Sequence, residues 1–174
     1  MYRLGRTSLD NHFSLLNLPR QFDLSLDALE QAWKQASAQV HPDRFATASA
    51  VEKRVAVQWA SRINEAYQTL KNPLNRAAYM CELENFPIEA ESNTAMSTDF
   101  LMTQMQWREQ LDDIRSDPKH MGLSVLLEDI QQKQGELFRD MKDLLDNRQD
   151  YANATRLVRE WMFVNKMHQE VKAL

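Results

Sequence analysis

The stretch HPDRF (residues 41–45) lies between two long segments whose apolar residues recur at helical spacing. Pro42 restricts His41 to an extended conformation, so the helix before it must end near residues 39–41. A second helix is predicted from about residue 51 to residue 70, where Asn72-Pro73 ends it. Two long helices joined by a short loop form an antiparallel hairpin, so HPDRF is predicted to lie in the loop of a helical hairpin.

Each helix of this hairpin has one apolar face, which we expect to be buried. On the first helix, which Ser25 is expected to cap, the face consists of Leu29, Trp33, Ala36 and Val40. On the second helix the face consists of Val55, Trp59, Ile63, Ala66 and Leu70. A short helix over residues 11–18, stopped by Pro19, is predicted to precede the hairpin.

The composition of the 174 residues favours helices and argues against several classes of protein. There are 3 Gly and 5 Pro, fewer than a sheet-rich fold with many turns requires. The single cysteine, Cys81, excludes an internal disulfide, and the 4 histidines are too scattered to predict a metal site. We therefore expect no metal and no cofactor. No apolar run is long enough to cross a membrane, and the first residues lack the apolar core of a secretory signal, so a cytosol-like compartment is predicted.

The net charge of −4 argues against broad nucleic-acid binding, and its uneven distribution suggests two units. Residues 1–79 hold 10 Lys+Arg and 7 Asp+Glu, a net charge of +3. Residues 80–174 hold 11 Lys+Arg and 18 Asp+Glu, a net charge of −7. Residues 80–93 contain Pro87 and four glutamates, and we interpret them as a linker that is partly helical at its start. The predicted domains are therefore residues 1–79 and residues 94–174.

Three further helices are predicted after the linker, over about residues 98–115, 123–147 and 151–171, which is the pattern of a three-helix bundle. The middle helix carries an apolar seam, interrupted by Gln134, at spacings of three and four residues: Leu127, Ile130, Leu137, Met141 and Leu144. The last helix, with Asp150 as its expected cap, has one apolar face: Leu157, Trp161, Val164, His168 and Val171. We interpret His168 as a core histidine with satisfied hydrogen bonds rather than a ligand.

The helix over residues 98–115 carries apolar residues on two faces. At 100° per residue, four of them fall within about 60° of one another and form the expected buried stripe: Phe100, Trp107, Leu111 and Ile114. Leu101, Met102 and Met105 lie away from that stripe, beside charged residues. Such a patch is a candidate interface, and it equally fits a face that packs on another helix of the bundle. Phe163 likewise points away from the apolar face of the last helix.

The tripeptide His41-Pro42-Asp43 alone also fits a simple helix stop, but its context resembles a J-domain, the module with which DnaJ-type co-chaperones stimulate the ATPase of DnaK-type chaperones. The resemblance covers residues 11–79, and after the loop it rests on Ala66, Tyr67, Leu70, Pro73, Arg76 and Tyr79. It implies that His41, Pro42 and Asp43 contact the chaperone, with Asp43 as an acceptor for a partner cation. It also implies that basic side chains dock on an acidic chaperone surface; the candidates are Arg44, Lys34, Lys53, Arg54 and Arg62.

The chain as a whole, over residues 11–172, resembles the HscB family, the J-proteins dedicated to iron–sulfur cluster assembly. The stretches DFLMTQMQWREQLDDI (99–114) and VREWMFVNKM (158–167) carry this resemblance in the second half. It implies an all-α fold in which a J-domain and a C-terminal three-helix bundle form an L-shaped two-domain arrangement. It implies two partners, an HscA/DnaK-type chaperone and an IscU-like cluster scaffold, in a bacterial cytoplasm. The residues that match the scaffold-binding set are Leu101, Met102, Met105, Arg108, Glu109 and Phe163.

Three alternatives to this adaptor remain open. The chain could be a J-protein whose second unit binds another client. The apolar patch could instead be the seam of an oligomer. An enzyme of helical fold is the third alternative, and no metal-ligand cluster, phosphate loop or nucleophile pattern in the sequence supports it. We therefore predict a regulator of a partner's ATPase rather than an enzyme.

Overall fold

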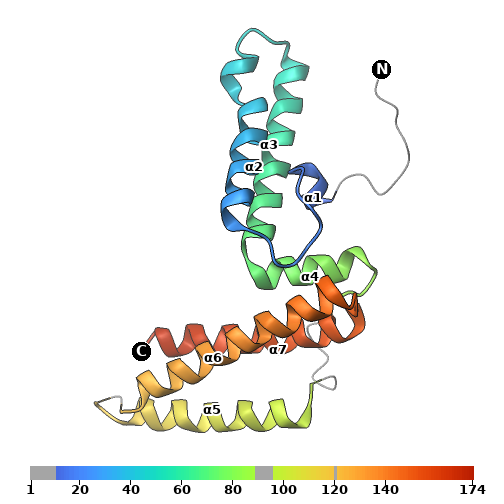
Figure 1. Cartoon of the computed structure of the whole chain (residues 1–174). Coiled ribbons are helices and arrows are strands. Elements are labelled where there is room, and N and C mark those ends of the chain that lie inside the picture. The colour runs from blue at the N-terminus through green and yellow to red at the C-terminus, as the bar shows by residue number, and fades with distance from the viewer. Residues whose placement is uncertain (1–10, 89–95, 120) are drawn as a thin grey trace. The chain divides into compact units, whose positions relative to one another are not determined.

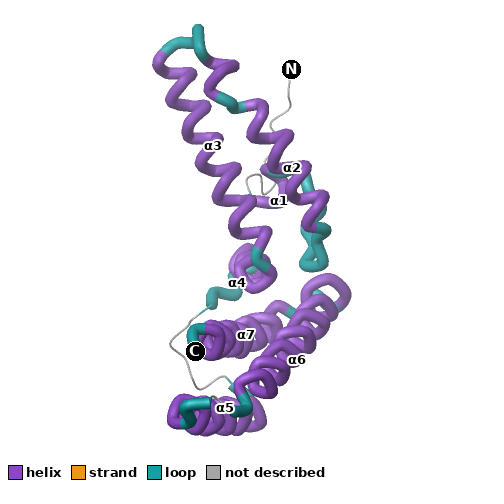
Figure 2. The backbone as a smooth tube through the Cα atoms, turned by 90° about the vertical axis from the view of Figure 1, so that its left-hand side faces the viewer, coloured by secondary structure: helices purple, strands orange, loops and turns teal. Residues whose placement is uncertain are grey.

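The computed structural model describes residues 11–88, 96–119 and 121–174, and every regular element in these ranges is helical (Figures 1 and 2). The predicted all-α fold is therefore confirmed. The chain forms two compact units, Met1–Tyr79 and Met80–Leu174, and each has its own buried core. None of the described helices combines the length and the apolar character that crossing a membrane requires.

The first unit is built on the predicted hairpin. Its elements are α1 (His12–Leu15), α2 (Leu26–Gln39), a 3-10 turn (Pro42–Phe45), α3 (Ala50–Lys71) and the first part of α4 (Pro73–Leu83). The Ser25 side chain caps α2 by accepting the Ala28 N–H, as predicted. A capping box of Ser49 and Glu52 begins α3. The short helix α1 ends earlier than predicted because Asn17 adopts a left-handed conformation, with φ of 52°.

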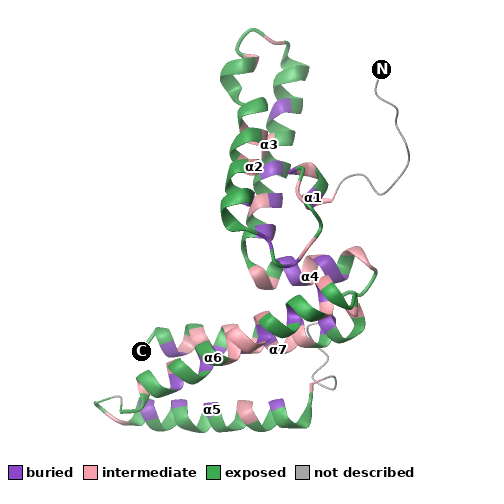
Figure 3. Cartoon of the chain, viewed as in Figure 1, coloured by how far each residue is buried: buried purple, intermediate pink, exposed green. Residues whose placement is uncertain are grey.

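The predicted apolar face of α3 is buried in its second half only. Ile63, Ala66 and Leu70 are buried, whereas the prediction was wrong for Val55 and Trp59, which are 45% and 37% exposed. In this half of α3 Ala56 is buried and Ala60 is half-buried, so the face that packs there is shifted by one residue from the predicted one. Figure 3 shows the same trend on both helices of the hairpin, which are mostly exposed toward the loop. On α2, Leu29 is buried and the rest of the predicted face is half-buried.

The dipeptide Asn72-Pro73 ends α3 as predicted, and it also begins α4, which the sequence did not predict as a separate helix. The Asn72 side chain accepts the Asn75 N–H, and Pro73 occupies the first helical position, where its missing N–H costs nothing. Arg76 of α4 is buried beneath the Phe22 ring and donates from Nη1 to the Leu70 carbonyl at 2.6 Å. This bond satisfies a carbonyl at the end of α3 and joins the two helices.

The second unit is the predicted three-helix bundle of α5 (Thr98–Ser116), α6 (Leu123–Lys142) and α7 (Tyr151–Lys172). Helices α6 and α7 pack most closely, and α5 packs on α6. The stripe predicted for α5 is confirmed, because Phe100, Trp107, Leu111 and Ile114 are all buried. The middle helix differs from the prediction in its last turn. The α-helix ends at Lys142, and a π-helical turn, Asp143–Asn147, follows it directly.

The apolar seam of α6 differs from the prediction at its two ends. Leu126 and Leu145 are buried there, whereas the predicted Leu127 and Leu144 are half-buried. The buried set is spaced by four or seven residues, which keeps one side of the helix against its neighbours. On α7, His168 is half-buried, and its Nε2 is enclosed without a hydrogen-bond partner among the described residues. His168 thus packs at the edge of the core rather than inside it, and its expected hydrogen bond is not made by a described protein group at Nε2.

Candidate functional site

The HPD turn, residues 41–45, projects from the end of the hairpin in a fixed local conformation. His41 caps the 3-10 turn: its Nδ1 accepts the Asp43 N–H at 3.3 Å and lies 3.5 Å from Asp43 Oδ2. Pro42 supplies a fixed φ at the first position of the turn. The side chains of His41 and Asp43 are 59% and 90% exposed. Because Nδ1 faces the turn, the Nε2 edge of His41 and the Asp43 carboxylate are available to a partner.

An apolar hollow of about 430 Å³ opens beside the HPD turn, where α2 and α3 are not covered. Its lining includes Val40, Pro42, Phe45, Lys53 and Val57. Sequence reasoning missed this hollow. Val57 is 66% exposed and lies off the predicted apolar face of its helix, and a valine in that position is a sequence signal that could have pointed to the hollow.

The five candidate basic residues do not gather at one place. Arg44 lies in the turn, and Lys53 lines the hollow beside Pro42. The amine of Lys34 is paired with Glu30 at 2.6 Å, and this partner raises the Lys34 pKa. Arg54 is exposed in the first turns of α3.

Arg62 lies farther along α3, about 12 Å beyond Arg54 at 1.5 Å per residue. Its guanidinium lies over the Trp59 ring, 5.4 Å from the centroid. Together with His12 and Glu65 it lines a second hollow, of about 230 Å³. Burial lowers the pKa of His12, and the Glu65 carboxylate opposes this shift. The structure therefore places Arg62 in a different environment from that of the HPD turn.

A second exposed surface lies on α5 in the other unit. We call Leu101, Met102 and Met105 the apolar surface; their exposed fractions are 39%, 60% and 65%. The other apolar stripe of this helix is buried in the bundle, so these three side chains are not needed for the packing of the helix. The prediction that they lie away from the core is confirmed.

The polar and aromatic residues of the predicted scaffold-binding set lie beside this surface on two helices. Phe163 of α7 is half-buried and meets Phe100 edge to face, with ring centroids 5.8 Å apart. Arg108 of α5 places its guanidinium 5.8 Å from the Phe163 centroid, a cation–π contact. Glu109 is exposed on α5. The structure thus brings Arg108 and Phe163 together, a contact that the sequence did not predict.

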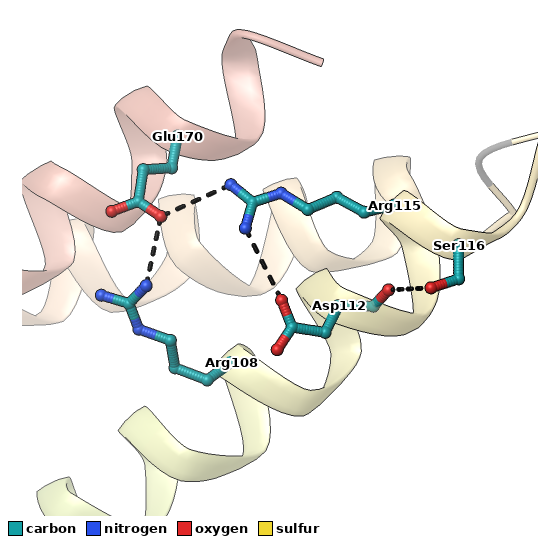
Figure 4. A network of polar contacts seen from close by, with 5 residues as sticks. All are labelled: Arg108, Asp112, Arg115, Ser116 and Glu170. Atoms are coloured by element: carbon teal, nitrogen blue, oxygen red, sulfur yellow. Dashed lines mark hydrogen bonds and ion pairs between the residues drawn. The ribbon is translucent and has the colours of Figure 1, made fainter.

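Sequence reasoning missed a network of charges that continues from Arg108 (Figure 4). One carboxylate oxygen of Glu170 on α7, Oε2, forms ion pairs with two arginines of α5. It lies 3.3 Å from Arg108 Nη1 and 3.7 Å from Arg115 Nη2. Arg115 Nη1 also lies 3.6 Å from Asp112 Oδ1. The heptad spacing of the two arginines was visible in the sequence, but nothing there points to Glu170, 62 residues after Arg108.

The described residues contain no group of three or more His, Cys, Asp or Glu side chains that could hold a metal ion. Cys81 is buried, and this burial raises the pKa of its thiol. Burial also raises the pKa of the Glu160 carboxyl and lowers that of the His168 imidazole. Burial is the main cause of all three pKa shifts, and the three residues lie apart in sequence from the HPD turn and the apolar surface. We therefore assign them packing roles.

Two family models match this chain, one for each half. Residues 11–79 match the DnaJ domain, and residues 96–172 match the model described as the HSCB C-terminal oligomerisation domain. The fold, the HPD turn and the first match define a J-domain co-chaperone, a regulator of a partner protein rather than an enzyme.

Close relatives identify the family. A co-chaperone protein HscB homolog of Bordetella avium is 50% identical over 165 residues, which cover 95% of this chain and 97% of the relative. The HscB homolog of Bordetella petrii is 52% identical over 165 residues, covering 94% of this chain and 95% of the relative. The chain therefore belongs to the HscB family of co-chaperones, which is associated with iron–sulfur cluster assembly. The resemblance stated from the sequence is confirmed.

Solved structures of HscB proteins also resemble this one. Chaperone HscB from Vibrio cholerae has a TM-score of 0.82 and 32% sequence identity, covering 94% of this chain and 96% of that chain. The crystal structure of human co-chaperone protein HscB has a TM-score of 0.86 and 23% identity, covering 97% of this chain and 84% of that chain. At that identity, the human protein supports the fold alone.

Proposed function

We propose that the chain is an adaptor between two proteins of iron–sulfur cluster assembly. In this proposal the J-domain binds an HscA/DnaK-type chaperone and stimulates its ATPase. The C-terminal bundle binds an IscU-like scaffold protein and delivers it to that chaperone. The observation that carries the proposal is the presence of two exposed surfaces, one on each compact unit, whose side chains the fold does not need for its own cores. The bacterial relatives support a bacterial cytoplasm as the compartment.

The geometry of the HPD turn supports its role in binding the chaperone. The Asp43 carboxylate is 90% exposed and can accept hydrogen bonds from a partner cation, the kind of pair that gains from charge assistance. His41 holds the turn through Nδ1, so replacing it changes both the partner contact and the turn that presents Asp43. Arg44 and Lys53 give this end of the unit a positive charge, which favours an acidic partner and speeds encounter at low salt.

The apolar surface supports scaffold binding by the second unit. Leu101, Met102 and Met105 form an exposed patch on one helix, and methionine side chains adapt well to a partner's shape. Arg108 and Phe163 border the patch and add an aromatic and a cationic contact, the residue types that often dominate interfaces. Because one chain carries both surfaces, binding of the scaffold raises its effective concentration at the chaperone.

The test is the single-turnover ATPase rate of an HscA-type chaperone. The rate is measured alone, with this protein, with an IscU-type scaffold, and with both, and the His41→Gln variant is the control. We expect a rise with this protein, a larger and synergistic rise with both, and no rise with the variant. A rise that the scaffold cannot enhance would leave a J-protein with another client. No rise with any DnaK-type chaperone would refute the role of the HPD turn.

A second candidate function for the C-terminal unit is self-association. The family model that matches residues 96–172 is described as an oligomerisation domain, and an exposed apolar patch is also what an oligomer seam requires. Sedimentation of the wild type and of Met105→Asp separates the two functions. A monomeric wild type supports scaffold binding as the use of the patch, whereas an oligomer that Met105→Asp dissociates supports the seam.

A further inference from the structure

One face of α5 changes from apolar to charged along its length. Leu101, Met105, Arg108, Asp112 and Arg115 are spaced by four, three, four and three residues, so they share one side of the helix. The first two belong to the apolar surface, and the last three are charged. Arg108 lies where the two halves meet.

Glu170 of α7 closes the charged half of this face. One of its oxygens, Oε2, lies 3.3 Å from Arg108 Nη1 and 3.7 Å from Arg115 Nη2 (Figure 4). The Glu170 side chain is 24% exposed, whereas that of Arg108 is 45% exposed. The more enclosed carboxylate therefore anchors a guanidinium that remains accessible to a partner.

Arg108 has a second contact on α7, with the Phe163 ring. Phe163 precedes Glu170 by seven residues on α7, so the two side chains lie on one side of that helix. The Arg108 guanidinium lies 5.8 Å from the Phe163 centroid, and the ring itself is packed edge-on against Phe100. Two contacts on α7 thus restrict a side chain that is otherwise among the most flexible in proteins.

We propose that Glu170 is a positioning residue of the scaffold-binding surface. It holds the Arg108 guanidinium over Phe163, beside Met105, in the orientation that binds a polar group of the scaffold. A guanidinium has five N–H donors, so the bond to Glu170 leaves others for the partner. A side chain that is already ordered loses less conformational entropy on binding, which strengthens the complex. This inference rests on the proposed scaffold binding.

The same contacts contribute little to the stability of the fold. Arg108 and Arg115 are 45% and 43% exposed, and ion pairs between exposed side chains are weak. Arg115 also retains Asp112 as a partner when Glu170 is changed. A substitution at Glu170 is therefore expected to alter binding without unfolding the bundle.

The test compares Glu170→Gln with Glu136→Gln in the full chain. Both variants replace one partly exposed glutamate of an ion pair by its amide, and Glu136, which pairs with Lys133 on α6, lies outside the proposed surface. The dissociation constant of a purified IscU-type scaffold is measured for each. We expect about two- to fivefold weaker binding for Glu170→Gln and no change for Glu136→Gln. Because its guanidinium lies 5.8 Å from the Phe163 centroid, the Nε–H resonance of Arg108 is expected to lie away from its random-coil position in the free wild type and to move toward that position in Glu170→Gln only.

The double variant Arg108→Ala/Glu170→Gln distinguishes positioning from an independent contact. If Glu170 acts through Arg108, the double variant binds the scaffold as weakly as Arg108→Ala alone. Additive losses, unchanged binding by Glu170→Gln, or an Arg108 Nε–H resonance that keeps its wild-type position in that variant would each overturn the proposal. A wild type that fails to bind the scaffold would instead refute the proposed function, and the role of Glu170 with it.

Discussion

Replacing the apolar surface by alanine is expected to abolish most scaffold binding and to leave the fold intact. Full burial of a leucine or methionine side chain is worth about 1.5–3 kcal/mol. A partner can bury only what is still exposed, which is 39% of Leu101, 60% of Met102 and 65% of Met105. Their contributions are therefore about 1 kcal/mol for the leucine and about 1–2 kcal/mol for each methionine. The triple alanine variant is expected to lose about 3–5 kcal/mol, or roughly 100- to 5,000-fold in affinity.

The matched control for this variant is Leu111→Ala on the same helix. Leu111 is fully buried in the stripe on the opposite side of α5, so its truncation leaves a cavity and costs about 3–5 kcal/mol of unfolding free energy. Substitutions of exposed side chains usually change stability by less than about 0.5 kcal/mol each. Isothermal titration with the scaffold and thermal melting by circular dichroism measure the two effects separately.

Comparing the two variants shows whether the apolar surface binds a partner or forms part of the core. We expect Leu111→Ala to lower the melting temperature by more than about 6 °C, and the triple variant to lower it by much less. A fall in the triple variant as large as that of Leu111→Ala would show that the surface is part of the core. An unchanged scaffold affinity in a folded triple variant would show that the scaffold binds elsewhere.

Three further predictions concern single residues. His41→Gln is expected to abolish stimulation of the chaperone ATPase while scaffold affinity stays at the wild-type value; loss of both would contradict separate surfaces. Cys81 is buried and its thiol pKa is raised, so a thiol reagent at pH 7–8 is expected to label it slowly in the native protein and rapidly in denaturant. Burial raises the pKa of Glu160, so the folded state holds its proton more tightly than the unfolded state. The stability that this proton provides is present below the unfolded pKa and is lost as pH rises toward the folded pKa. The melting temperature of Glu160→Gln relative to the wild type is therefore expected to be higher at pH 7 than at pH 4. The same difference between the two proteins at both pH values would contradict this.

Local rules predicted most of the helices in this fold. Ser25 and Asp150 cap the helices that they were expected to cap, and Pro42 and Pro73 lie where helices were expected to end. Such features depend on residues close in sequence, so periodicity and capping chemistry can locate them. The angular position of Leu101 relative to Phe100 likewise depends on one helix, which explains why the exposed surface could be predicted.

The failures concern features that depend on what a second element covers. Val55 and Trp59 continue an apolar stripe, yet they are exposed, and the neighbouring Ala56 and Ala60 are the more buried residues there. Glu170 meets Arg108 through the packing of α5 and α7, and no local pattern relates two residues so far apart in sequence. Tertiary contacts of this kind decide burial and ion pairing, and periodicity carries no information about them.

Because the side chains of both surfaces are exposed, substitutions among them are expected to leave the fold intact. His41 and Asp43 are exposed at the loop end of the hairpin, whereas most buried residues of that unit lie nearer α1 and α4. On α5, Met102 and Met105 project away from the stripe that packs on the bundle. Side chains that bury little surface within the chain contribute little to its stability, so substitutions there act mainly on partner binding. The two units also have separate cores, so a change in one surface need not perturb the other. Under this reasoning, variants of His41 and Met105 combined in one chain lose both interactions independently and melt close to the wild type.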